Sequence, residues 1–196
     1  MRTYRGASAP ERRADRRARL LAACLDVIGE VGVLGVTVDA VCARAGLTKR
    51  YFYETFADRE AALDAVADDV YDGLHVSIGS ALRRADGDQR ARASTAVEVF
   101  AATLDADPRI ARLYAESPGH PRLCARRDAA VDRFADLVLD DVLRLGPGDR
   151  ERARTAAVLV VAGTTHVVTR WLAGGVPLAR VELVDEVTRI GTKLLT

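Results

Sequence analysis

The chain carries no proline between Pro10 and Pro108. Proline breaks helix interiors and alanine, the commonest residue here, is the best helix former, so this long stretch favours helix. Apolar residues recur at steps of three and four from Leu20 to Val31, as on one face of an amphipathic helix. β-Branched runs such as 158–161 lack the alternation of a half-buried strand. We therefore predict an all-α fold of about nine helices.

Composition excludes several classes of protein. The 196 residues include 49% hydrophobic and 29% charged residues, which argues against disorder. No apolar run approaches the roughly 20 residues of a membrane span, so we expect no membrane partner. Three cysteines, none in a Cys-x-x-Cys arrangement, indicate reduced thiols and a cytoplasmic protein. The net charge is +1, yet residues 1–19 hold seven arginines against Glu11 and Asp15.

Two short helices with a tight turn between them are predicted over about 37–56. Thr37 is a suitable N-cap for the first helix, Gly46 ends it, and Thr48 is a suitable N-cap for the second. A long helix should follow over about 58–84. These dimensions are typical of a helix-turn-helix.

The second short helix divides into two faces. Phe52 and Phe56 should point inward with Leu47. An outer face of Lys49, Arg50, Tyr51 and Tyr53 would offer donors to phosphates and guanine edges and aromatic rings to sugars. The alternative is a solvated face with two half-buried tyrosines.

Residues 18–72 resemble the N-terminal DNA-binding domain of the TetR-type regulators. The matching residues, in chain order, are Val31-Gly32, Thr37, the run from Val41 to Thr48, Phe52-Tyr53, Phe56 and the run from Arg59 to Leu63. The resemblance implies three phosphate contacts, by Thr37, by Tyr53 and by Arg59, where the family usually has lysine. It also implies that four residues face base edges: Thr48, Lys49, Arg50 and Tyr51.

The predicted organisation has three parts. Residues 1–17 form a basic flexible arm, too polar to pack, that either follows DNA or only solubilises the chain. Residues 18–57 form the helix-turn-helix domain. Residues 58–196 form a helical effector-binding and dimerisation domain, as the resemblance implies.

The effector implied by the resemblance would be a small molecule inside the second domain. The predicted lining residues lie on helix faces expected to point inward, and the alternative for each is ordinary core. They are Phe100, Leu104, Tyr114, Phe134, Leu137, His166 and Trp171. A buried His166 would need a hydrogen-bond partner, either a neighbouring threonine or the ligand.

Two acidic stripes repeat every four residues, at Asp64, Asp68 and Asp72 and at 128–140. Like charges at this spacing repel, so a metal or arginines should offset them. Arginines, with Arg83, Arg84, Arg126 and Arg133 nearby, are the commoner solution. We predict no metal and no cofactor.

The last two helices, about 149–173 and 179–195, should form a homodimer interface, as the resemblance implies. Their apolar stripe comprises Val158, Val161, Val168, Leu172, Leu183, Val187, Ile190 and Leu194. A dimer suits a palindromic operator, because two recognition helices must reach grooves about 34–36 Å apart.

The sequence lacks nucleophile, phosphate-loop and metal motifs, so no catalytic residue is predicted. Our interpretation is a transcriptional repressor that a small molecule releases from double-stranded DNA. The alternative is an effector-free DNA-binding protein with a packed C-terminal core.

Overall fold

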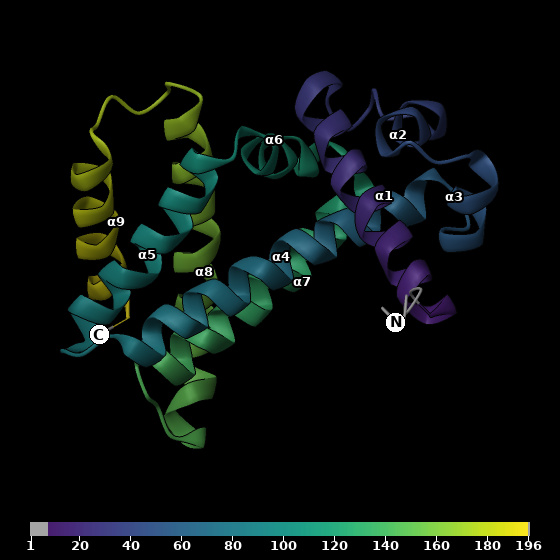
Figure 1. The fold of residues 1–196 in the computed structure, drawn as a ribbon. Coiled ribbons are helices and arrows are strands. Elements are labelled where there is room, and N and C mark those ends of the chain that lie inside the picture. The colour runs from purple at the N-terminus through teal and green to yellow at the C-terminus, as the bar shows by residue number, and fades with distance from the viewer. Residues whose placement is uncertain (1–7, 196) are drawn as a thin grey trace, which may run out of the picture.

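The structure is a computed structural model that describes residues 8–195, with the side chain of Pro147 left out. Within that range it contains nine α-helices and no strand (Figure 1), as predicted. The helices are α1 (Ala9–Val31), α2 (Val38–Ala45), α3 (Lys49–Thr55), α4 (Arg59–Arg84), α5 (Gln89–Ala106), α6 (Pro108–Glu116), α7 (Pro121–Leu137), α8 (Pro147–Leu172) and α9 (Arg180–Leu194).

Helices α1, α2 and α3 share a core in which Leu20, Phe52 and Phe56 are buried. The predicted inward direction of the two phenylalanines is confirmed. Cys24 and Cys42 are buried free thiols, and burial raises the pKa of Cys24 to about 12. Both thiols therefore stay protonated at neutral pH.

The predicted flexible arm is wrong for the part of it that the structure describes. Residues 9–17 are the first turns of α1, while the arm's other arginines, Arg2 and Arg5, lie outside the described residues. Ser8 caps the helix: its Oγ accepts a hydrogen bond from the Glu11 N–H at 3.3 Å, and its N–H donates to Glu11 Oε2 at 2.6 Å. This capping box satisfies the backbone N–H groups of Ser8 and Glu11 at the start of the helix.

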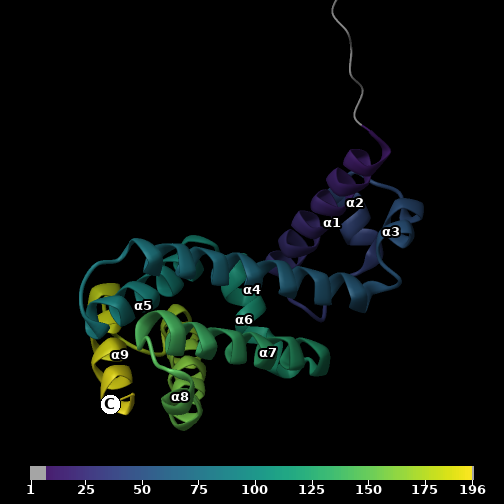
Figure 2. The same ribbon diagram turned by 90° about the horizontal axis from the view of Figure 1, so that it is seen from below.

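Helix α4 runs from the three-helix core into the rest of the molecule, with α7 alongside it (Figures 1 and 2). The two helices run in the same direction, since successive residues of α4 form ion pairs with successive residues of α7. Asp64 pairs with Arg122, Asp68 with Arg126 at 2.9 Å, and Asp72 with Arg133. The second acidic stripe meets α8 through Asp132 and Asp136, which pair with Arg154.

Arginines therefore offset both acidic stripes, as the sequence predicted in preference to a metal. Arg126 and Arg133 were foreseen and Arg122 was not. Arg83 instead donates a hydrogen bond to Ser80 at 2.9 Å.

Two short turns flank α7 between α6 and α8. Helix α7 is preceded by a 3₁₀ turn (η1, Ser117–Gly119) and followed by a π turn (η2, Val138–Val142). The buried side chain of Arg92 donates to the Asp141 carbonyl at 2.6 Å and to the Ala85 carbonyl at 3.0 Å. One α5 arginine thus fixes both the π turn and the end of α4.

Helix α6 joins the three-helix core to the rest of the molecule. Glu116 accepts hydrogen bonds from the Val33 N–H and from Arg112 Nε, both at 2.7 Å. Arg112 also donates to the Gly29 carbonyl at 3.1 Å. Gly32 follows α1 with φ at +79°, a backbone conformation that favours glycine.

The predicted apolar stripe on α8 and α9 divides between two directions. Val168 and Leu183 are buried within the subunit, whereas Ile190 and Leu194 are exposed. Among the described residues, the helical stretch from Gly148 to Leu172 is, by length and composition, able to cross a membrane, because an 18-residue window within it has a mean hydropathy of 1.2. Only a small part of that stretch is buried in the subunit, so an apolar helical face is left uncovered.

Candidate nucleic-acid interface and ligand cavities

The turn between α2 and α3 has the expected helix-turn-helix form. Gly46 ends α2 with φ at +62°, a left-handed conformation that suits glycine. Thr37 caps α2 as predicted, because its Oγ1 accepts from the Ala40 N–H at 3.1 Å. Thr48 occupies the N-cap position of α3, but its side chain makes no capping hydrogen bond, contrary to the expectation from sequence.

The outer face of α3 is exposed. The side chain of Arg50 is 84% exposed and that of Lys49 is 57% exposed, and Tyr51 and Tyr53 are exposed as well. Phe52, buried beneath them, meets the Tyr53 ring edge-on, with ring centroids 5.5 Å apart. The face therefore rests on a packed core and is open to a partner.

Two surface ion pairs hold the cations of this face. Lys49 Nζ lies 2.7 Å from Asp39 Oδ1, and Arg50 Nε lies 2.9 Å from Glu54 Oε1. Hydrogen bonds to these carboxylates raise the pKa of Lys49 and of Arg50, so both stay charged. Exposed pairs of this kind are weak, and phosphates or base edges can replace the carboxylates.

Arg59, for which the resemblance implies a phosphate contact, has its guanidinium engaged within the chain. Its guanidinium donates to the carbonyls of Val36 at 2.7 Å and of Val33 at 2.6 Å. The remaining terminal nitrogen pairs with Glu60. Arg59 thus holds the segment between α1 and α2 at the start of α4.

Sequence reasoning missed three arginines of α1 that contact the helix-turn-helix. The Arg16 guanidinium lies 4.7 Å from the centroid of the Tyr51 ring, and that of Arg17 lies 5.2 Å from the Phe56 centroid. Arg19 donates to the Ala45 carbonyl at 2.7 Å. Their helical spacing just before Leu20 was the available signal, but their polarity suggested an unpacked arm instead.

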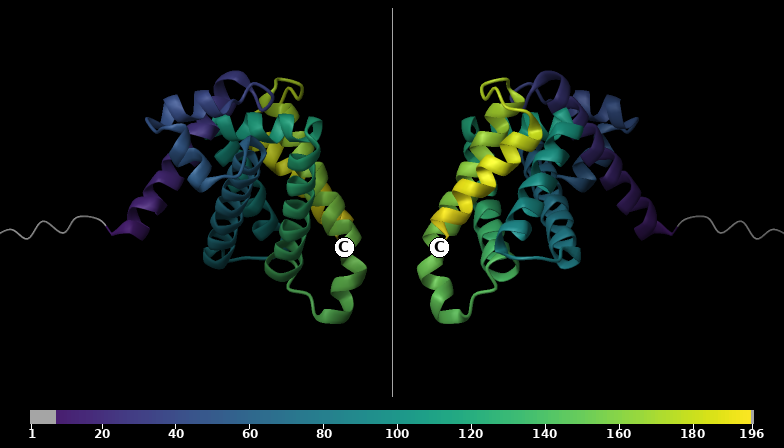
Figure 3. Two further views of the ribbon diagram at one scale, coloured as in Figure 1. Left: turned by 90° about the vertical axis from the view of Figure 1, so that its right-hand side faces the viewer. Right: turned by 90° about the vertical axis from the view of Figure 1, so that its left-hand side faces the viewer.

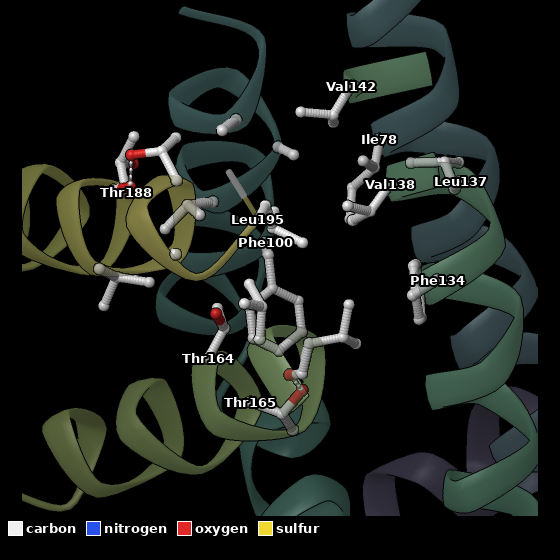
Figure 4. Close-up of a pocket in the computed structure, with 18 residues that line it drawn as sticks. Ile78, Phe100, Phe134, Leu137, Val138, Val142, Thr164, Thr165, Thr188 and Leu195 are labelled. Atoms are coloured by element: carbon white, nitrogen blue, oxygen red, sulfur yellow. Dashed lines mark hydrogen bonds between the residues drawn. The ribbon is translucent and has the colours of Figure 1, made fainter. Parts of the chain in front are cut away.

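Five of the seven predicted lining residues border one of two cavities in the described part of the molecule. Phe100, Phe134 and Leu137 surround an apolar cavity of about 90 Å³ (Figure 4). Tyr114 and His166 line a larger cavity of about 620 Å³ bounded by α6, α7 and α8. Small-molecule pockets usually measure about 300–1,000 Å³, so only the larger of these two has that size.

Three of the predicted lining residues need correction. Leu104 is buried and borders neither cavity. Trp171 also borders neither; its indole N–H donates to the Leu178 carbonyl at 2.8 Å, which holds the α8–α9 turn. His166 is exposed at the edge of the larger cavity rather than buried, and Thr169 hydrogen-bonds to its carbonyl oxygen rather than to its ring.

A third hollow, of about 220 Å³, lies between α8 and α9 on the outside of the subunit. Leu159, Ile190 and Leu194 line it and are 61%, 45% and 53% exposed. Gly163 and Gly191 also line it. Leu159 was not in the predicted apolar stripe.

Comparison with known proteins gives consistent matches. Residues 20–66 match the family model described as bacterial regulatory proteins, tetR family. The chain is 30% identical over 175 residues to the HTH-type transcriptional activator FasR of Mycolicibacterium smegmatis, covering 88% of this chain and 80% of that protein.

Solved structures show the same fold. The fatty acid degradation regulator FadR from Bacillus halodurans superposes with a TM-score of 0.74 at 20% identity, covering 97% of each chain. A TetR family transcription regulator from Marinobacter aquaeolei VT8 gives 0.71 at 16% identity, over 95% of this chain and 98% of that one. The chain belongs to the tetR family of bacterial regulatory proteins and is a DNA-binding transcriptional regulator, not an enzyme.

Proposed function

We propose that this regulator binds a palindromic operator as a homodimer and responds to a small-molecule effector. The observation that carries the proposal is the outer face of α3, where Lys49, Arg50, Tyr51 and Tyr53 are exposed above the buried Phe52. Thr37 and Tyr53 are proposed to contact phosphates. Thr48, Lys49, Arg50 and Tyr51 are proposed to face bases, with Arg50 bidentate to guanine.

The homodimer is proposed to form through α8 and α9. The exposed side chains of Leu159, Ile190 and Leu194 form an apolar surface that a second copy would cover, because contiguous exposed apolar patches mark interfaces. Covering this surface also accounts for an apolar α8 in a cytoplasmic protein. Symmetry then presents two α3 helices to successive major grooves.

The effector is proposed to occupy the cavity of about 620 Å³ lined by Tyr114 and His166. This cavity borders α6, whose last turn hydrogen-bonds through Glu116 to Val33, just after α1. A ligand that favours one position of α6 would therefore change the placement of α3, and a coupling of about 1–3 kcal/mol is enough to matter.

Repression is the proposed direction of control, since a dimer bound across a promoter excludes polymerase. The relative FasR is named an activator, so transcription from the bound promoter with and without this protein decides the direction. Increased transcription would overturn repression but not DNA binding.

The DNA-binding proposal predicts that Arg50→Ala weakens operator binding about tenfold or more, the value of one bidentate guanine contact. Binding to random duplex should change little. Fluorescence anisotropy with the selected operator and with scrambled DNA measures both. Arg84→Ala, an exposed arginine at the far end of α4, is the matched control. Equal losses for the two variants would contradict the assignment.

The effector proposal predicts that some member of a metabolite panel raises the thermal midpoint and changes operator affinity. A ligand at about 100 times its Kd adds roughly 2.7 kcal/mol. Ala162→Trp, which fills the larger cavity from α8, should abolish the shift but leave binding to operator DNA intact. A panel hit that still binds Ala162→Trp would place the effector elsewhere, and no hit at all would favour the effector-free alternative.

A further inference from the structure

The first turns of α1 form a basic helical extension, residues 9–19, that lies outside the part of the chain shared with the family model. That model matches residues 20–66, and the buried positions of α1 begin at Leu20. At 1.5 Å per residue the extension adds about 16 Å of helix beyond the three-helix core. Its end projects past α2 and α3 in three views (Figures 1, 2 and 3).

The sequence of the extension is poor in apolar side chains and rich in cations. It holds Arg12, Arg13, Arg16, Arg17 and Arg19 against two acidic residues, Glu11 and Asp15. Glu11 is part of the capping box, where the Ser8 N–H lowers its pKa, and Asp15 lies 3.9 Å from Arg19. The capping box and continuity with the rest of α1 make this segment helical without burial, so Arg12 and Arg13 stay exposed.

Two arginines of the extension lie over aromatic rings of α3 and its C-cap residue. Arg16 lies over the ring of Tyr51 at 4.7 Å and Arg17 over that of Phe56 at 5.2 Å. A cation over an aromatic ring at this distance is attractive. Arg12 is four residues before Arg16 and hence on the same helix face, one turn further out, so the row of arginines continues from the face of α3 outward.

We propose that this extension is a second DNA-contacting element, in which Arg12 and Arg13 bind backbone phosphates that flank the groove entered by α3. Arg16 and Arg17 are positioning residues that set the angle between the extension and α3. The extension reads no bases, because it presents cations from a rigid helix lying beside the groove rather than within it. It adds affinity that is independent of sequence and sensitive to salt.

The test compares the double variant Arg12→Gln/Arg13→Gln with Arg83→Gln/Arg84→Gln in the full chain. The second pair removes the same charge from the far end of α4. Anisotropy titrations with the operator and a scrambled duplex are run from 50 to 300 mM KCl. Each phosphate contact contributes about −0.9 to the slope of log K against log salt.

The expected result for Arg12→Gln/Arg13→Gln is a slope shallower by about 2 for each bound protomer. Affinity should fall by the same factor, at least about tenfold at 100 mM salt, for both duplexes. The α4 pair should leave both slopes unchanged. Unchanged slopes for the α1 pair, or a loss confined to the operator, would overturn the proposal.

Helical rigidity is tested with Ala14→Pro, which breaks the helix between the two outer arginines and Arg16 while keeping every charge. We expect a loss of affinity comparable to that of the double glutamine variant, with the thermal midpoint of the domain unchanged, because its core begins at Leu20. Wild-type affinity in Ala14→Pro would show that a flexible basic tail suffices, and it would overturn the rigid element. If the wild-type chain binds DNA in the same titrations, α3 functions, and either contradictory result concerns only the extension.

Discussion

At the scale of single residues, the role of a charged side chain depends on what lies within reach of it. Arg50 and Arg59 are both arginines of the helix-turn-helix region, yet one is 84% exposed and the other 27%. Arg50 extends from α3 with a single carboxylate partner. Arg59 satisfies backbone carbonyls that α4 brings close to it. The family resemblance implied DNA contacts for both residues.

The geometry of Arg59 predicts that Arg59→Lys destabilises the fold, although lysine is the residue that the family resemblance leads one to expect. Lysine has one nitrogen and cannot span the carbonyls of Val33 and Val36. The expected loss is about 1–2 kcal/mol in the free energy of unfolding, measured by urea denaturation. Full stability with weakened DNA binding would instead support the phosphate contact expected from sequence.

At the scale of elements, the hydrogen bonds between α6 and α1 connect the helix-turn-helix to the cavity-bearing part. Glu116 is central to this junction, because it accepts from the Val33 N–H and from Arg112. Burial opposes ionisation, but these hydrogen bonds outweigh it and hold the pKa of Glu116 below its usual value. The folded state therefore stabilises the ionised Glu116 carboxylate more than the unfolded state does.

This lowered pKa gives the junction a defined pH dependence. Stability from Glu116 is present above its unfolded pKa, near 4.5, and is lost as pH falls through the lower folded value. Glu116→Gln should cost about 1–2 kcal/mol at pH 7, and the difference from wild type should shrink below about pH 4. Thermal unfolding from pH 7 to pH 3.5 measures this. A constant difference across that range would mean that the carboxylate charge contributes nothing.

At the scale of the whole molecule, the uncovered apolar surface on α8 and α9 is where the proposed homodimer would form. Leu159 and Ile190 line it from different helices. A lone α3 reaches one groove, whereas a palindrome needs two at a fixed spacing. A substitution that prevents assembly through this surface should therefore also lower operator affinity.

Leu159→Glu/Ile190→Glu should convert the proposed dimer to a monomer, because dimerisation would then bury two carboxylates against an apolar partner. Sedimentation equilibrium measures the mass, and operator binding should fall in parallel. Val76→Glu is the control, since Val76 is 64% exposed on α4 and lies outside the hollow between α8 and α9. A monomeric wild type, or a dimer that survives the double substitution, would contradict this interface.

The sequence by itself determined most of the helices, the turn at Gly46 and the two faces of α3. These depend on periodicity, on capping groups and on the steric freedom of glycine, which act over a few residues. It also indicated that arginines balance the acidic stripes, since like charges four residues apart need neutralising. The family followed from the same local pattern.

Only the tertiary structure decided which long-range partners each side chain meets. Arg16 reaches Tyr51, 35 positions away, Arg59 reaches the segment before α2, and His166 faces outward. The seven predicted lining residues separated into two cavities and core for the same reason. Periodicity shows that a helix face is apolar, but the packing of several helices determines whether that face covers a cavity, a core or a second subunit.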